Sequence, residues 1–108
     1  MSDRDLVRHI LDEVVFLRTA ASATTLDAFL RDEVLKRAFA RSLEIVGEAS
    51  KKLTPDFRDA HPSVEWRLMA GTRDKLIHDY FGVDYGLVWD IVVNELPGLE
   101  TELRGLLR

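Results

Sequence analysis

The spacing of apolar residues along the chain predicts helices. Near the N-terminus these residues recur largely every three or four positions, which is the period of one face of an α-helix. They are Leu6, Ile10, Leu11, Val14, Phe16 and Leu17. An amphipathic helix is therefore predicted from residue 3 to about residue 21, with Ser2 as its N-cap. Small polar residues then break the pattern, and Thr24 with Asp27 resembles a capping box for the next helix.

A second seam of apolar and small residues predicts a long helix in the middle of the chain. The seam steps alternately by four and three residues through Leu35, Phe39, Ser42, Val46, Ala49 and Leu53. It predicts a helix over residues of about 32 to 53 that ends before Pro55, because the residue before a proline disfavours the helical conformation. Residues 56–60 lie between Pro55 and Pro62, so at most a helical turn is expected there.

Two further helices are predicted in the second half of the chain. One should run from an N-cap at about Ser63 to Tyr80, with Gly82 available as a C-terminal cap. The last should follow an N-cap at Asp84 and be kinked at Pro97. No hairpin dipeptide lies between alternating apolar residues, so no strand is expected.

The predicted fold is therefore all-α, an up-down bundle of four main helices plus the short helical turn. Its 108 residues are expected to form a single domain, 1–108, and its 46% hydrophobic content suits a packed core. Because the chain contains no cysteine, disulfides, thiolate metal sites and cysteine nucleophiles are excluded. There is no apolar run of membrane length and no signal-peptide pattern, so a cytoplasmic protein without membrane contact is expected.

The charge distribution restricts the kind of nucleic-acid contact that is expected. A net charge of −4 counts against an extended nucleic-acid surface, and no DNA binding is expected. Basic groups outnumber acids by six to four in residues 31–52, whereas acids outnumber basic groups by five to two in residues 84–108. RNA would therefore be bound at a restricted site, and an acidic flank would be available to a basic partner.

The chemistry concentrates in an R-x-x-x-x-H-x-Y motif formed by Arg73, His78 and Tyr80. A guanidinium can clamp a phosphate through two hydrogen bonds, and an imidazole can exchange a proton near neutral pH. These groups are suited to metal-free RNA cleavage. On an ideal helix, Arg73 and Tyr80 would lie ~20° apart and His78 ~140° from Arg73, so either the helix distorts near its end or a second copy completes the site.

Other carboxylates and imidazoles near the motif allow alternatives. Asp74 and His78, four residues apart, could help to bind a divalent metal with Asp79 or Asp84, although two ligands fall short of a site. Glu44 and Glu48 lie one helical turn apart, as paired acid–base carboxylates would. An ion network is the simpler interpretation of that pair, because basic residues lie at helical spacing to both. These basic residues are Arg37, Arg41, Lys51 and Lys52.

The motif lies within a longer stretch that resembles one protein family. Matching segments follow one another in the family's order. They are residues 41–49, 52–55, 61–62, 66–67, 71–73, 78–81, 83–84, 87–89 and 96–97. From about residue 25 to about residue 104 the chain looks like the HepT-type HEPN family, the ribonuclease toxins of toxin–antitoxin pairs. One position departs from the family pattern, because Asp74 stands where relatives often have asparagine and cannot donate a hydrogen bond when ionised.

The resemblance implies a homodimeric endoribonuclease that uses no metal or cofactor. His78 would deprotonate a ribose 2′-hydroxyl for attack on the adjacent phosphodiester, and Arg73 would neutralise the developing charge. Asp74, Glu44 and Glu48 are candidates for a supporting role. Tyr80 could position RNA, and the resemblance also implies that it accepts AMP from an MNT-type nucleotidyltransferase antitoxin, in a system like type VII. The substrate could be tRNA or mRNA.

Two non-catalytic interpretations remain open at this point. The chain could be a helical module that docks a nucleotidyltransferase and helps it to bind nucleotide, with Arg73 as a phosphate anchor and His78 in a structural role. It could also be a degenerate HEPN dimer that serves only as a scaffold because Asp74 weakens the site. Loss of metal-independent cleavage in His78→Ala separates the ribonuclease from both.

Overall fold

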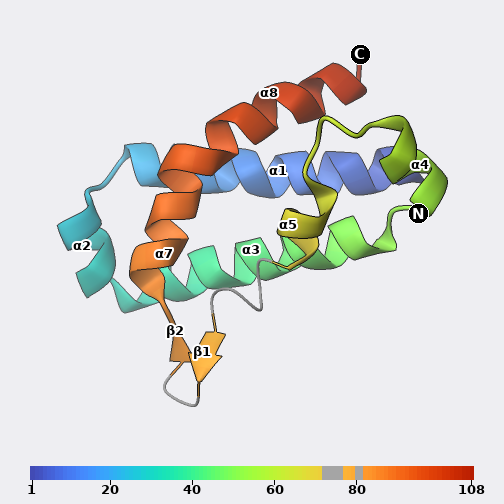
Figure 1. The fold of residues 1–108 in the computed structure, drawn as a ribbon. Coiled ribbons are helices and arrows are strands. Elements are labelled where there is room, and N and C mark those ends of the chain that lie inside the picture. The colour runs from blue at the N-terminus through green and yellow to red at the C-terminus, as the bar shows by residue number, and fades with distance from the viewer. Residues whose placement is uncertain (72–76, 80–81) are drawn as a thin grey trace.

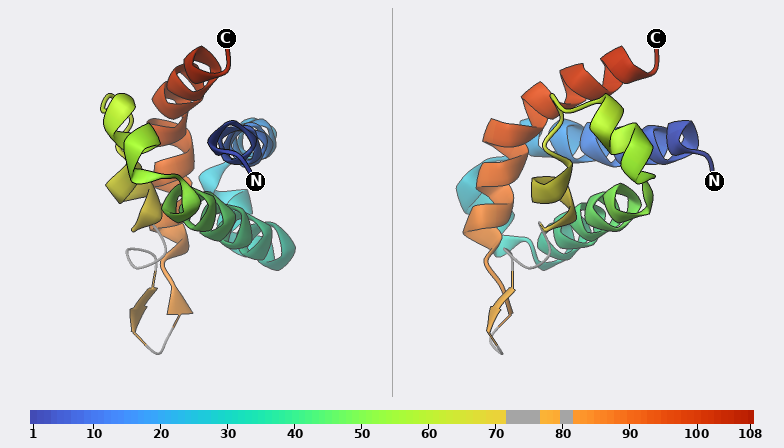
Figure 2. Two further views of the ribbon diagram at one scale, coloured as in Figure 1. Left: turned by 90° about the vertical axis from the view of Figure 1, so that its right-hand side faces the viewer. Right: turned by 45° about the vertical axis from the view of Figure 1, so that its right-hand side comes forward.

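The computed structural model describes residues 1–71, 77–79 and 82–108, and it shows an all-α fold (Figure 1). The side chains of Leu68 and of residues 77–79 lie outside this description. Two long helices, α1 (Asp3–Ser22) and α3 (Glu33–Lys52), pack side by side, and α8 (Leu96–Leu106) packs along α1. The predicted fold class is thus confirmed, and a short β-hairpin projects from the helical body (Figure 2).

Polar caps fix the ends of the first three helices. The Ser2 hydroxyl accepts from the Asp5 amide at 3.1 Å and the Asp5 carboxylate accepts from the Ser2 amide, so the predicted N-cap is confirmed as part of a capping box. The cap of α2 (Leu26–Arg31) was predicted one residue early, because Thr25 caps this helix through the Ala28 amide. Asp32 caps α3 through the Leu35 amide at 2.9 Å, which confirms the predicted start of the long helix.

The core joins the faces of these helices through close aromatic contacts. Phe29 of α2 is fully buried, and its ring lies 4.8 Å from that of Phe39 on α3. The same ring lies 5.2 Å from Trp89 on α7 (Tyr85–Asp90). Burial of such rings is the main stabilising term for a chain with no disulfide. Phe29 therefore holds α2, α3 and α7 together at one end of the molecule.

Helix α4 (Pro55–Ala60) is longer than the turn predicted between the two prolines. Its N-cap, Thr54, accepts from the Phe57 amide at 3.2 Å. Thr54 also donates to Asp3 of α1, through its amide at 2.9 Å and its hydroxyl at 2.7 Å. These two hydrogen bonds, the amide first, lower the pKa of the Asp3 carboxyl. The start of α4 is thereby tied to the start of α1.

The prediction of one helix from about Ser63 to Tyr80 is wrong. The described residues at the start of this range precede the helix, and those near its end form a strand. Helix α5 covers only Trp66–Ala70, and it begins after Glu65 without a side-chain cap. Strand β1 (Ile77–Asp79) pairs antiparallel with β2 (Gly82–Val83). Gly82 has a φ of 106°, which an L-residue with a side chain rarely adopts, so glycine here permits the return of the chain rather than capping a helix.

The C-terminal helical segment is interrupted near Pro97, as predicted. Asp84 caps α7 through the Leu87 amide at 3.0 Å, which confirms the predicted N-cap. The helix then widens into a π-helical segment, η1 (Ile91–Glu95), before α8 begins with Pro97 in its first turn. A proline has no amide hydrogen to donate, and a π segment is one way to accommodate the change in hydrogen bonding. In the described part of the chain, no helix is long and apolar enough to cross a membrane.

A carboxylate on α8 joins this helix to α1. Glu100 accepts from the Arg104 Nε at 2.9 Å and from an Arg18 terminal nitrogen at 2.9 Å, with its own side chain 18% exposed. These two hydrogen bonds, Arg104 first, lower the pKa of Glu100 below its ordinary value of 4.5. A lowered carboxyl pKa means that the folded state favours the ionised form.

Glu100→Gln should therefore lower stability in a pH-dependent way. We expect a loss of about 1 kcal/mol at pH 7, since partly exposed ion pairs contribute little more. The contribution is present above the unfolded pKa and is lost as the pH falls through the lowered folded pKa, so the two proteins should converge below pH 4.5. Urea unfolding at several pH values measures this difference. Glu102→Gln, an exposed position on the same helix, is the matched control, and an equal loss there would contradict the role of Glu100.

Candidate functional site

The predicted catalytic motif occupies the segment between α5 and α7. Arg73, Asp74 and Tyr80 lie outside the described residues, and of His78 only the backbone is described, as the middle residue of β1. The roles assigned to these side chains therefore stay predictions. The hairpin that carries His78 extends away from the helices, with Ile77 opposite Val83 and Asp79 opposite Gly82.

The extended backbone at His78 changes the geometry on which part of the dimer prediction depended. That prediction took Arg73, His78 and Tyr80 as points on one ideal helix, which would separate His78 from Arg73 by ~140°. Residues 77–79 form a strand, so this separation does not apply and the helical interpretation is wrong there. The helical-angle argument therefore gives no support for a second copy.

A glycine on α3 positions the helix that leads into the motif. Gly47 is buried, and a β-carbon added there would lie 3.1 Å from the Met69 carbonyl oxygen and 3.6 Å from that of Ala70. The C-terminal turn of α5 thus rests directly on the backbone of α3. Because the C-cap of α5 is Gly71, two residues before Arg73, this contact sets where the motif segment starts.

The two glutamates proposed as supporting residues lie on either side of Gly47 on α3. Glu44 accepts from an Arg41 guanidinium nitrogen at 3.3 Å, with 36% of its side chain exposed, and Glu48 is exposed. The Arg41–Glu44 pair confirms a surface ion pair at this position. The motif side chains lie outside the described residues, so the supporting role of both carboxylates stays a prediction. The alternative metal site is not tested as a whole, although the Asp84 carboxylate that it invoked caps α7.

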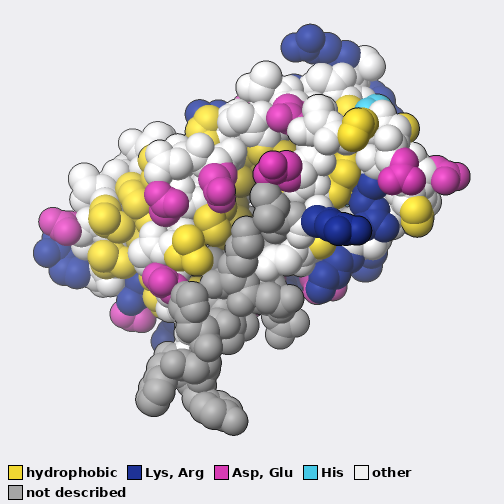
Figure 3. All heavy atoms as spheres, in the orientation of Figure 1, with side chains coloured by type: hydrophobic (Ala, Val, Ile, Leu, Met, Phe, Trp, Pro, Cys, Tyr) yellow, Lys and Arg dark blue, Asp and Glu magenta, His cyan; other side chains and the backbone are white. Residues whose placement is uncertain are grey.

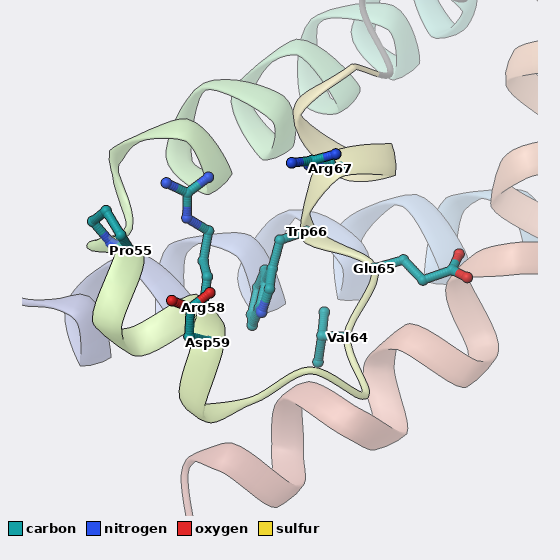
Figure 4. A pocket seen from close by; sticks show the side chains of 7 residues that line it. All are labelled: Pro55, Arg58, Asp59, Val64, Glu65, Trp66 and Arg67. Atoms are coloured by element: carbon teal, nitrogen blue, oxygen red, sulfur yellow. The ribbon is translucent and has the colours of Figure 1, made fainter.

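The structure also places two arginines in a groove that the sequence interpretation did not single out. This basic groove has a volume of about 490 Å³ and lies between α4 and the start of α5 (Figure 4). Its walls are Pro55, Arg58, Asp59, Val64, Glu65, Trp66 and Arg67. Trp66 is 5% exposed and donates through its indole nitrogen to the His61 carbonyl at 3.0 Å, so the ring is a fixed wall. Eight residues lie between the two arginines in the sequence, and no local pattern marks this spacing.

Comparison with known proteins identifies the family. A family model described as Ribonuclease HepT-like matches residues 10–106. The chain belongs to the HepT-like ribonuclease family. This confirms the resemblance read from the sequence, and with it an RNA-cleaving activity at the level of the family. The match to the HepT-like family model begins within α1 and continues to the end of α8.

Several HepT-like relatives align over nearly the whole chain. A protein of Caldanaerobacter subterraneus subsp. tengcongensis, provisionally named RNase TTE0752, is 46% identical over 97% of this chain and 94% of its own length. The provisionally named RNase MJ0127 of Methanocaldococcus jannaschii is 40% identical over 96% of this chain and 83% of its own. A Thermococcus cleftensis protein named "Probable ribonuclease HepT" is 38% identical over 97% and 96%. No solved structure matches significantly.

The contact at Gly47 yields a prediction for stability and for the position of α5. Gly47→Leu should lower the free energy of unfolding by about 1–3 kcal/mol, because its side chain must displace the backbone of α5. Gly105→Leu is the control, since no atom lies within 4 Å of a β-carbon there and it should cost nothing. Chemical denaturation measures both values. Equal stability of the two variants would show that α5 does not depend on this approach.

Proposed function

We propose that this chain is a metal-independent endoribonuclease, the toxin of a toxin–antitoxin pair like those of type VII. The observation that carries the proposal is the family match over residues 10–106, within which Arg73, His78 and Tyr80 form the R-x-x-x-x-H-x-Y motif. The whole chain acts as a single cytoplasmic domain, 1–108. Its substrate is RNA, with tRNA and mRNA as the two candidates.

Cleavage proceeds by internal transfer within the RNA. His78 takes the proton of a ribose 2′-hydroxyl, and that oxygen attacks the neighbouring phosphorus. The bond from phosphorus to the 5′-oxygen breaks, and this oxygen gains a proton. The products are a 2′,3′-cyclic phosphate and a free 5′-hydroxyl. Arg73 neutralises the charge on the phosphoryl oxygens, so the chemistry needs no metal.

Tyr80 is the point of control. A partner MNT-type nucleotidyltransferase joins the Tyr80 hydroxyl to the α-phosphorus of ATP, and pyrophosphate leaves. The attached AMP places a negative, bulky group beside the phosphate site, so it excludes RNA by repulsion and by volume. An acidic C-terminal segment, with five acids against two basic groups in residues 84–108, is available to a basic partner surface.

Apolar side chains that the folded chain leaves exposed support a homodimer. Val34 is 82% exposed at the start of α3, and Phe16 of α1 is 43% exposed. Leu26 and Leu30 of α2 are 42% and 40% exposed, so four apolar side chains remain uncovered on α1, α2 and α3. Exposed apolar side chains that lie together are typical of association surfaces, and a second copy of the chain is proposed to cover these four. This observation replaces the helical-angle argument as the support for a second copy.

The decisive experiment is cleavage of total cellular RNA in excess chelator by protein that mass spectrometry shows to carry no Tyr80 adduct. The parent should produce fragments with cyclic-phosphate ends, and His78→Ala should reduce the rate by about 10²–10⁴-fold through loss of the general base. His9→Ala, an exposed histidine on α1, should cleave as the parent does. Absence of cleavage by the unmodified parent would favour the nucleotidyltransferase-docking module instead.

A further inference from the structure

We propose that the basic groove is a phosphate subsite that binds the backbone of the RNA outside the cleavage motif. The inference rests on the proposed function for its ligand, and it assigns Arg58 and Arg67 as substrate-binding residues. Two guanidiniums are suited to this task, because each presents paired N–H donors that match phosphate oxygens. The volume of about 490 Å³ is sufficient for a nucleotide unit.

Both arginine side chains are free of competing partners within the described part of the chain. No hydrogen bond or ion pair from either guanidinium to another described residue is present. The Nε of Arg58 is also buried without an acceptor. A buried charged donor that lacks an acceptor is uncommon in folded proteins, because its desolvation is uncompensated. An incoming phosphate that draws the Arg58 guanidinium outward supplies the missing acceptor.

The acidic residues of the groove do not cancel this charge where the guanidiniums lie. Figure 4 shows the guanidiniums of Arg58 and Arg67 on the same side of the groove, while the Glu65 side chain extends away from them. Asp59 lines the groove but forms no ion pair with either arginine. Lys51 and Lys52, both exposed, end α3 beside α4, and Figure 3 shows basic side chains gathered at this end of the molecule, with acidic side chains at its outer edge.

The wall of the groove makes these charges more effective. Trp66 and Val64 are 5% and 3% exposed, and Phe57 packs 6.0 Å from the indole of Trp66. A charge beside such an apolar wall is screened less than one in open water, so its attraction for phosphate is stronger. The Trp66 ring is nearly covered, so it supports the arginines and does not stack on a base.

The chain connection links this groove to the catalytic motif. Arg67 lies on α5, and the motif segment begins immediately after that helix. The approach of α5 to α3 at Gly47 fixes the helix that carries Arg67 and that leads into the motif segment. A strand of RNA that crosses the groove is thus held by the same helix that leads to Arg73. The small basic groove fits a backbone phosphate better than an acidic protein partner, which would need a larger surface.

The test measures binding of a 2′-O-methyl RNA, which the proposed mechanism cannot cleave. Parent protein without a Tyr80 adduct is compared with Arg58→Gln/Arg67→Gln across a salt series. We expect the Kd to rise about 10–100-fold and the salt slope to fall by about 0.7–1.4, as for the loss of one or two phosphate contacts. Arg31→Gln/Arg37→Gln, which removes two exposed arginines near the opposite end of α3, should change the Kd by less than about threefold.

Three further comparisons identify the ligand and show that a loss of binding does not come from misfolding of a variant. Arg58→Lys/Arg67→Lys keeps the charge and should retain the salt slope while losing affinity, and circular dichroism confirms that each variant folds. Inorganic phosphate at equal phosphate concentration should not displace the RNA. Displacement by inorganic phosphate would reduce the groove to a free-anion site, and stronger displacement by polyglutamate would make it a protein-docking site. Either result overturns the proposal.

The two proposals fail in different ways. If the parent cleaves RNA and the glutamine double variant binds the 2′-O-methyl RNA as tightly as the parent, the groove is not an RNA subsite and the ribonuclease stands. If the parent binds this RNA through both arginines but cleaves no RNA, the subsite stands and the catalytic proposal is lost.

Discussion

The close approach of α5 to α3 at Gly47 is the constraint on which both the motif and the groove depend. A glycine at this position lets the carbonyls of Met69 and Ala70 lie against the α3 backbone, where a side chain would separate the helices. The end of α5 that rests there leads into the motif segment, and its start forms one wall of the basic groove. One backbone contact inside the bundle therefore sets the positions of two surfaces proposed to meet the same RNA.

The other wall of the groove depends on a polar relay between the ends of two helices. Thr54 accepts from the first turn of α4 and donates to Asp3 at the beginning of α1. Capping by a threonine is worth about 1 kcal/mol, so the relay adds modest stability. Its larger effect is on the direction of α4, because this six-residue helix buries no residue of its own to hold it in place. The relay keeps Arg58 opposite Arg67.

The sequence predicted those parts of the fold that local signals decide. Ser2 and Asp84 cap their helices as expected because an N-cap acts within one turn, and the long α3 follows its apolar seam. The strand at residues 77–79 was missed because its partner, β2, begins at Gly82, whose positive φ no periodicity reveals. The groove was missed for a related reason: Arg58 and Arg67 meet only once α4 and α5 have packed.

An acidic protein can still bind RNA if its charges are segregated. Lys51 and Lys52 lie at the C-terminal end of α3, where the helix dipole favours cations, and the next helix, α4, carries Arg58. The excess of acids lies in residues 84–108, mainly on α7, η1 and α8. Within a Debye length of ~10 Å, RNA is attracted to the first surface and repelled from the second. This distribution of charge, and not the net charge of −4, supports the proposal that RNA binds at the groove and that the acidic residues of the C-terminal segment are left to the proposed basic partner.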